Sequence, residues 1–297
     1  MVEYFNFFYF LYIGFALGLL LLLYFLLRKK RKKTAETVLF CLFFANFSLH
    51  FLKLFSDHYQ QWMPYAIRTI TPENVCALSV LVFPWFFLSR NKILRDYMFF
   101  MGFMSGLGAT LIPVDAIGNN PFEFEVMRFY TSHILLWVLP LLMVLLKVHT
   151  LNYRRILKVP FVGYAVLCVI LANEIILIGT GFVPPEFLFS NDVHNSALIF
   201  GPLADVAFLG ALFTPLTPSV FLTMPLGPDA GAPFYWPILW LVIPFFIYFS
   251  ALALLLSLPF EHKRIRKDIA ALMKKTTSTM TVKKRRKKHR LKQTPPR

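Results

Sequence analysis

Long apolar runs alternate with short polar segments along most of the chain. A helix needs about 20 apolar residues to cross a hydrocarbon core about 30 Å thick. The runs that approach this length cover about residues 5–27, 35–55, 74–89, 97–113, 129–146, 158–179 and 235–257. The pattern therefore predicts an all-α, polytopic membrane bundle of seven transmembrane helices in residues 1–262, of which the third and fourth are the shortest.

Composition and the placement of charge support this interpretation. Hydrophobic residues make up 57% of the chain and charged residues 15%, whereas soluble proteins have about 25% charged residues. The net charge is +16, but all of the 31 Lys and Arg residues except Lys53, Arg68 and Arg128 follow an odd-numbered run. The positive-inside rule then places the N-terminus outside and the C-terminus inside. Because the positive charge flanks the apolar runs, we expect no nucleic-acid partner.

Two parts of the chain depart from the pattern of spans. Residues 180–234 contain ALIFGPLADVAFLGALF, from 197 to 213, but a crossing there would move the basic C-terminus to the outside. We therefore expect a re-entrant or interfacial loop, broken by Pro202. Residues 263–297 are too charged and too poor in apolar residues to pack, so we expect a disordered cytoplasmic tail that binds anionic lipid headgroups.

Four polar side chains on four different runs share one depth near the outer boundary. At 1.5 Å per residue, Cys76 and His133 lie within about 3–6 Å of that boundary, and His50 and Glu174 lie about five residues from it. A thiol beside an imidazole provides a nucleophile and its base, the pairing that forms acyl-thioester intermediates. A histidine in a membrane is more often an interhelical hydrogen-bond partner, however, and a lone cysteine is more often a small hydrophobe. The residues alone leave both interpretations open.

Other residues at this end of the bundle could bind or orient a substrate. One face of the fifth helix, which we expect to line a cavity, carries Tyr130, His133, Trp137 and Pro140. Further candidates from the other runs and from the loops are His50, Asn74, Asn173, Glu174, Arg68 and Arg128. His50 could be another base or a polar wall. Glu174 or Asn173 could orient the imidazole of His133. The amide before the third run could stabilise an oxyanion, and the arginines could anchor helix ends or hold a lipid phosphate.

Local signals refine the fourth and fifth helices. In NNPFEFE, Asn120 suits the N-cap, Pro121 the first helical position and Glu123 the third position of a capping box. Gly102 and Gly106 have the spacing of four that permits close contact between membrane helices. The three cysteines show no CxxC spacing, and we expect neither a metal ion nor a cofactor.

Residues from Thr71 to Leu146 carry a resemblance to a known family. NVCALSVLVFPWFF, MGFMSGLGATLIP and PFEFEVMRFYTSHILLWVLPLLMVL resemble the transmembrane protein 164 family and its bacterial YwaF-like relatives. The resemblance implies a membrane acyltransferase that moves a fatty acyl group between phospholipid and lysophospholipid, with Cys76 and His133 as the catalytic pair. YwaF-like proteins usually have an L-H-L-C-D type of pattern around the cysteine, so that Glu73, Asn74 or Glu174 would replace the aspartate here. The implied location is a bacterial cell membrane, or the endoplasmic reticulum in a eukaryote.

Three other classes of protein share parts of the pattern. A small-solute or proton-coupled transporter could use the histidines and Glu174 as a relay, although no inverted repeat is visible in the sequence. A seven-span receptor would have the same orientation, but the seventh run lacks a lysine for a retinal Schiff base. A non-enzymatic lipid-binding protein would form no acyl-enzyme. Labelling of Cys76 by an activated ester separates the acyltransferase from all three classes.

Overall fold

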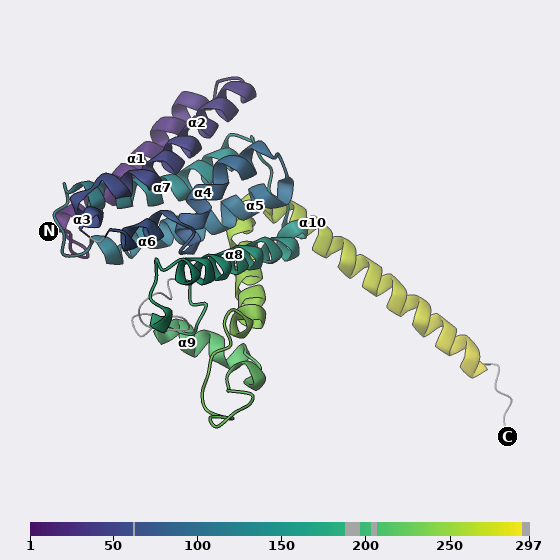
Figure 1. The fold of residues 1–297 in the computed structure, drawn as a ribbon. Coiled ribbons are helices and arrows are strands. Elements are labelled where there is room, and N and C mark those ends of the chain that lie inside the picture. The colour runs from purple at the N-terminus through teal and green to yellow at the C-terminus, as the bar shows by residue number, and fades with distance from the viewer. Residues whose placement is uncertain (62, 188–196, 203–206, 293–297) are drawn as a thin grey trace.

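The computed structural model describes residues 1–61, 63–187, 197–202 and 207–292, which are almost entirely helical between their connecting turns (Figure 1). The α-helices are α1 (Phe7–Leu27), α2 (Lys32–Phe51), α3 (Asp57–Gln60), α4 (Val75–Leu88), α5 (Lys92–Met101), α6 (Gly108–Leu111), α7 (Phe124–Leu145), α8 (Val159–Gly179), α9 (Ala207–Phe213) and α10 (Val242–Lys292). Short 3-10 helices are η1 (Leu52–Phe55), η2 (Tyr65–Ile70), η4 (Val114–Ala116), η5 (Tyr153–Lys158), η6 (Pro185–Phe187), η8 (Thr214–Leu216), η9 (Ser219–Phe221) and η10 (Leu239–Leu241), whereas η3 (Gly102–Leu107) is a π-helix. The described residues include no strand and only one isolated antiparallel bridge, between Thr223 and Pro233.

Six helical runs of the described chain are long and apolar enough to cross a membrane. They are Phe7–Leu27, Lys32–Phe55, Lys92–Ala116, Phe124–Leu145, Tyr153–Gly179 and Leu239–Ala271. The third predicted span corresponds to α4, whose 14 residues extend only about 21 Å. The all-helical membrane fold is therefore confirmed, while the seven-helix count and the orientation of the termini stay predictions.

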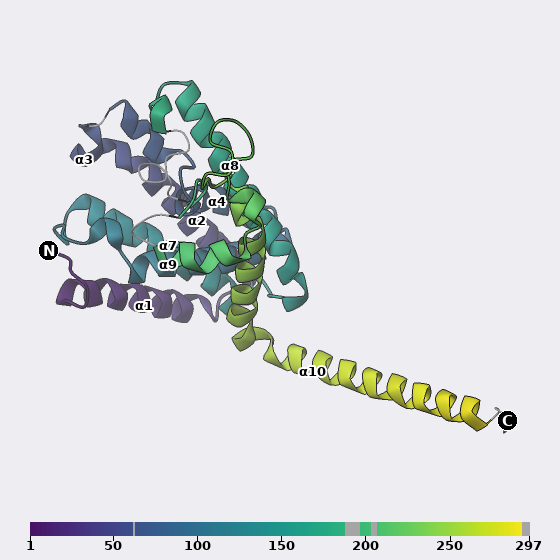
Figure 2. The ribbon, with the colours of Figure 1, turned by 90° about the horizontal axis from the view of Figure 1, so that it is seen from below.

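Helix α7 lies at the centre of the bundle and is the most buried of the six candidate spans. Within its most apolar window 78% of the residues are buried, compared with 11% for α1 at the edge (Figure 2). The α1 helix contacts α7 through Tyr12, whose ring stacks on Tyr130 at 3.8 Å between centroids. The remaining outer surface of α1 is apolar, as expected for a helix that faces lipid.

A close contact joins η3 to α7. A Cβ atom added at Gly106 would lie 2.7 Å from the His133 carbonyl oxygen, and one added at Gly102 would overlap the Leu136 carbonyl oxygen. The two glycines thus allow backbone-to-backbone approach, as their spacing predicts. The π-helical turn that contains both of them fixes the fourth span against the residues that flank His133 on α7.

The start of α7 differs from the prediction. The helix begins at Phe124 with Glu123 at the N-cap and no side-chain cap, about one turn later than the predicted start at Pro121. The reason is that the Asn120 side chain accepts the Phe122 N–H at 3.1 Å. This bond closes a turn before the helix instead of capping the helix itself.

The described part of the segment that precedes α10 forms short helices. Residues 188–196 and 203–206 of the predicted re-entrant or interfacial loop lie outside the described residues, and α9 has seven residues. The segment packs on η10 and α10, where Thr217 donates to the Trp240 carbonyl of η10 at 2.8 Å and Tyr248 of α10 donates to the Leu212 carbonyl at 3.0 Å. Whether it is re-entrant or interfacial stays a prediction.

The C-terminal part of α10 leaves the body of the molecule as one continuous helix (Figures 1 and 2). Residues 263–292 belong to this helix, and the expected disorder of residues 263–297 stays a prediction. Lysine and arginine are good helix formers, and the segment to Lys292 contains neither Gly nor Pro. The helix bends near Pro259, where the proline ring interrupts the hydrogen-bond ladder.

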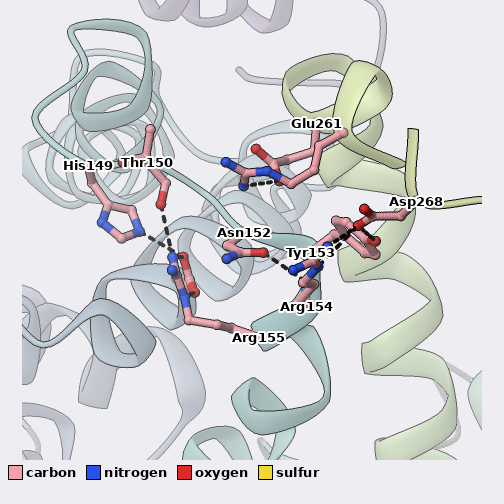
Figure 3. Close-up of polar contacts among 10 residues, drawn as sticks. His149, Thr150, Asn152, Tyr153, Arg154, Arg155, Glu261 and Asp268 are labelled. Carbon is pink, nitrogen blue, oxygen red and sulfur yellow. Dashed lines mark hydrogen bonds and ion pairs between the residues drawn. The ribbon is translucent and has the colours of Figure 1, made fainter. Parts of the chain in front are cut away.

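Ion pairs connect the helices at the end of the bundle where the basic clusters lie (Figure 3). The buried Asp96 carboxylate accepts hydrogen bonds from His149 at 2.7 Å and from Arg155 at 2.5 and 2.9 Å. Nearby, Asp268 of α10 accepts from Arg154 at 2.6 Å and from the Tyr153 hydroxyl. These contacts hold η5 against α5 and α10, far along the helices from the polar residues described next.

Candidate functional site

A cavity of about 370 Å³ lies at the opposite end of the bundle, where η1, η2 and η4 cover the helix ends. Its wall combines residues from α2, α4, α7 and the connecting segments. The lining residues are His50, Lys53, Tyr59, Glu73, Asn74, Val75, Cys76, Ala77, Val80, Ala109, Ile112, Val114, Asp115, Arg128, Phe129, Ser132 and His133. The structure therefore brings His50, Asn74, Cys76, Arg128 and His133 together in one cavity.

Cys76 lies in the first turn of α4, and this position follows from the local sequence. Asn74 has extended backbone angles and its side chain accepts the Ala77 N–H at 2.8 Å, which makes it the N-cap. The N–H groups of Val75 and Cys76 precede the first helical hydrogen bond and have no partner among the described residues. The half-buried thiol thus sits where the helix N-terminus offers backbone donors and a partial positive charge. The Ser105 side chain of η3 lies beside it.

His133 presents one ring nitrogen to a fixed partner. Its Nδ1 lies 2.8 Å from the Phe129 carbonyl oxygen, one turn earlier on α7. Because that oxygen can only accept, Nδ1 is the donor, and the neutral ring keeps its lone pair on Nε2. The Phe129 ring, 4.2 Å away between centroids, packs against the imidazole. These contacts orient the half-buried ring in the wall of the cavity and leave Nε2 to act as a base.

Two further basic side chains in the cavity bond to the loop that covers it. His50 Nε2 donates to the Ile70 carbonyl at 3.1 Å, and Lys53 Nζ donates to the Thr69 carbonyl at 2.7 Å. Both bonds attach η2 to the end of the second span. With Nε2 as the donor, the neutral ring of His50 keeps its lone pair on Nδ1, so the roles of a polar wall and of a second base both stay predictions.

A second cavity of about 350 Å³ adjoins the first. The two share Tyr59, Asp115, Arg128 and Phe129 in their walls, so a single molecule could extend through both. Arg128 is held between them by Glu125, which accepts from its Nε and Nη2 at 2.8 Å.

Charge at the rim of the cavities is set by burial and by neighbouring cations. Burial raises the pKa of Glu73, while the positive charges of Lys53 and Arg68 act in the opposite direction. Burial also raises the pKa of Tyr59 to about 12, so this phenol is neutral at physiological pH and can donate a hydrogen bond. The rim thus presents both donors and acceptors to a polar ligand.

Several predicted residues lie outside the cavity. Asn173 and Glu174 do not orient the imidazole: Asn173 donates to the Thr71 hydroxyl at 2.9 Å, and Glu174 pairs with Arg68 at 3.1 Å. Arg68 also pairs with Glu73 at 3.2 Å. These side chains lie at the predicted end of the bundle. The Arg68 guanidinium attracts the buried Glu174 carboxylate, however, so these contacts hold η2 in place and do not reach His133.

The predicted cavity face of α7 is also only partly correct. Tyr130 and Trp137 are buried behind the cavity, the first against Tyr12 and the second against Phe103. The face of α7 that carries Tyr130 and Trp137 is turned away from the cavity, because α1 and η3 pack against it. The face that lines the cavity instead carries Arg128, Phe129, Ser132 and His133.

Sequence reasoning missed Lys53, Tyr59 and Asp115 as cavity residues. Lys53 was noticed only as an exception to the positive-inside pattern, and that exception was the available signal. Among the residues that the structure describes, no group of three or more His, Cys, Asp and Glu side chains is arranged to hold a metal ion.

The fold and the site define a polytopic α-helical membrane protein with a thiol and an imidazole in one polar cavity between its helices. The model of the TMEM164 family matches residues 4–253. The chain therefore belongs to the TMEM164 family and is a multi-pass membrane protein. No curated protein and no solved structure matches the chain.

Proposed function

We propose that this protein is a membrane acyltransferase that moves a fatty acyl group between phospholipid and lysophospholipid through an acyl-thioester on Cys76. The observation that carries the proposal is that Cys76 and His133, from two different helices, line one cavity. The hydrogen bond from His133 Nδ1 to Phe129 supports it, since the remaining ring nitrogen has the lone pair that a general base needs. The resemblance of the surrounding sequence to a family of acyltransferases points to the same chemistry.

The first half of the reaction forms the thioester. His133 Nε2 takes the proton of the Cys76 thiol, and the thiolate attacks the ester carbonyl of the donor phospholipid. The C–O bond of the ester breaks, and the departing glycerol oxygen takes the proton back from the imidazolium. The products of this half are the S-acyl enzyme and a lysophospholipid.

The second half transfers the acyl group to an acceptor. His133 removes the proton of the acceptor hydroxyl, whose oxygen attacks the thioester carbonyl, and the thiolate leaves and is reprotonated by the imidazolium. In both halves a negative charge develops on the carbonyl oxygen. The unpaired N–H groups of Val75 and Cys76, or the Asn74 amide, are the donors available to stabilise it.

The test uses purified protein with a lysophospholipid and a phospholipid that is labelled in its acyl chain. Wild-type protein is expected to produce labelled product and a hydroxylamine-sensitive label on the protein, whereas Cys76→Ala should produce neither. Cys168→Ala is the matched control, because Cys168 is a free cysteine on the exposed side of another helix. Acyl transfer and labelling that persist in Cys76→Ala would refute the proposal and favour a transporter or a lipid-binding protein.

We further propose that the basic residues after position 262 contact anionic lipid headgroups. Fifteen Lys and Arg residues follow position 260, and each contributes about 1 kcal/mol near an anionic surface. Sedimentation of a peptide of residues 263–297 with anionic and with neutral vesicles measures this binding, and equal binding to both would contradict it.

A further inference from the structure

The ammonium group of Lys53 is buried in the cavity and forms no ion pair with the described residues. The residue is 8% exposed and Nζ donates to the Thr69 carbonyl. No carboxylate of the described residues lies within ion-pair distance of it, whereas Arg68, Arg128 and Arg155 each pair with a buried or half-buried acid. A buried charge without a counter-ion is costly. The arrangement is therefore expected of a site whose anion arrives with a ligand.

The position of this cation fits a ligand that also reaches the thiol. Lys53 belongs to η1 and lines the same cavity as Cys76 and His133. The Thr69 carbonyl takes one of the three ammonium protons, which leaves two for a ligand. Arg128 of α7 is in the same wall, and because Glu125 occupies its Nε and Nη2, its Nη1 group remains as a donor.

We propose that Lys53, together with Arg128, binds the phosphate of the phospholipid substrate and thereby places its glycerol oxygens next to Cys76. This inference rests on the proposed acyltransferase function and specifies how the enzyme recognises its substrates. A phosphodiester carries one negative charge and two unesterified oxygens, which match one ammonium and one guanidinium donor. A neutral glycerolipid has no anionic group to pair with Lys53, so the site should discriminate against it.

The experiment compares two acceptors with the same acyl chain, a lysophospholipid and a monoacylglycerol. Loss of a charge-assisted hydrogen bond in a buried site is expected to lower kcat/KM by about 10- to 100-fold. Lys53→Met should therefore lower the ratio of the value for lysophospholipid to the value for monoacylglycerol by this factor. Lys53→Arg, which keeps the charge, should recover most of the loss. An equal effect of Lys53→Met on both acceptors, or no effect on either, would overturn the inference.

A phosphate-free activated ester of short chain length serves as the control for folding and chemistry. It should still label Cys76 in Lys53→Met, because its reaction does not require the phosphate site. If Lys53→Met does not fold, the two acceptors are compared with wild-type protein alone. Equal kcat/KM values for lysophospholipid and monoacylglycerol would overturn the inference. Strong competition by millimolar inorganic phosphate would assign the site to a free anion and would also overturn it.

Failure of the proposed function can be recognised separately. A photoactivatable lysophospholipid is cross-linked to Cys76→Ala and to the double variant Cys76→Ala, Lys53→Met. Cross-linking that depends on Lys53 supports the phosphate site even where wild-type protein forms no acyl-enzyme. Cross-linking at equal yield in both variants contradicts the site, whatever the outcome of the labelling at Cys76.

Discussion

Replacing Gly106 by Ala tests whether the contact between η3 and α7 holds the imidazole in place. A new Cβ atom would lie 2.7 Å from the His133 carbonyl oxygen, 2.8 Å from the Leu136 Cβ and 3.0 Å from the Trp137 nitrogen. Two of these atoms belong to the backbone of α7, so no side-chain rotation removes the overlap. To bring 2.7 Å to an ordinary contact of 3.4 Å, the helices must separate by about 0.7 Å.

The expected effect on stability is smaller than the effect on activity. Overpacking of this kind costs about 1–3 kcal/mol, and the better helix propensity of alanine offsets up to about 1 kcal/mol of it. For a chain of this length a net loss of about 1–2 kcal/mol corresponds to a fall in Tm of roughly 2–8 °C. A misplacement of 1 Å at a catalytic group costs about 100-fold in rate. The displacement of His133 should therefore lower kcat by roughly 10-fold or more.

The matched control is Gly108→Ala, two residues further along the same span. A Cβ atom at Gly108 meets nothing within 4 Å, so this variant should be as stable as wild type or slightly more stable and fully active. Thermal unfolding in detergent and the rate of ester labelling at Cys76 measure the two effects. If Gly106→Ala unfolds at the wild-type temperature and labels at the wild-type rate, the contact does not position His133 and the reasoning is refuted.

Further substitutions separate catalytic from structural roles at this end of the bundle. Arg68→Gln leaves the buried Glu174 carboxylate unpaired and should lower the free energy of unfolding by about 3–5 kcal/mol; adding Glu174→Gln should recover part of this loss in a double-mutant cycle, and additive effects would contradict the pairing. His50→Gln keeps a donor for the Ile70 carbonyl and should reduce acyl transfer by less than about 10-fold, whereas His133→Gln removes the proposed base and should reduce it by about 100-fold or more. Equal losses in the two histidine variants would contradict the assignment of the base.

The helices of the bundle were largely predictable, whereas their ends were not. The apolar runs at 5–27 and 158–179 correspond closely to α1 (Phe7–Leu27) and α8 (Val159–Gly179), because hydrocarbon thickness sets a minimum length for a run. Helix ends depend on single hydrogen bonds, such as the one that the Asn120 side chain accepts from Phe122 N–H, which closes a turn before α7.

The sequence predicted which residues gather at this end of the bundle, but not which side chains contact each other. Counting residues from the ends of the runs placed His50, Cys76 and His133 in one layer, and the structure places all three in one cavity. The count carries no information about rotation around a helix axis, so Trp137 was assigned to the wrong face. It also carries no information about the loop of residues 56–74, whose fold brings Arg68 to Glu174.

The shortness of α4 is compatible with the proposed site at its N-terminus. Its 14 residues reach about 21 Å, about 9 Å less than a hydrocarbon core of about 30 Å. Arg90, two residues after its end, belongs at the headgroup level, so the first turn of α4 lies inside the opposite boundary. Free N–H groups at that depth would be costly in lipid, but there they face a polar cavity covered by η1 and η2. Under the proposed function, this position would bring the Cys76 thiol near the layer where a phospholipid carries its ester bonds.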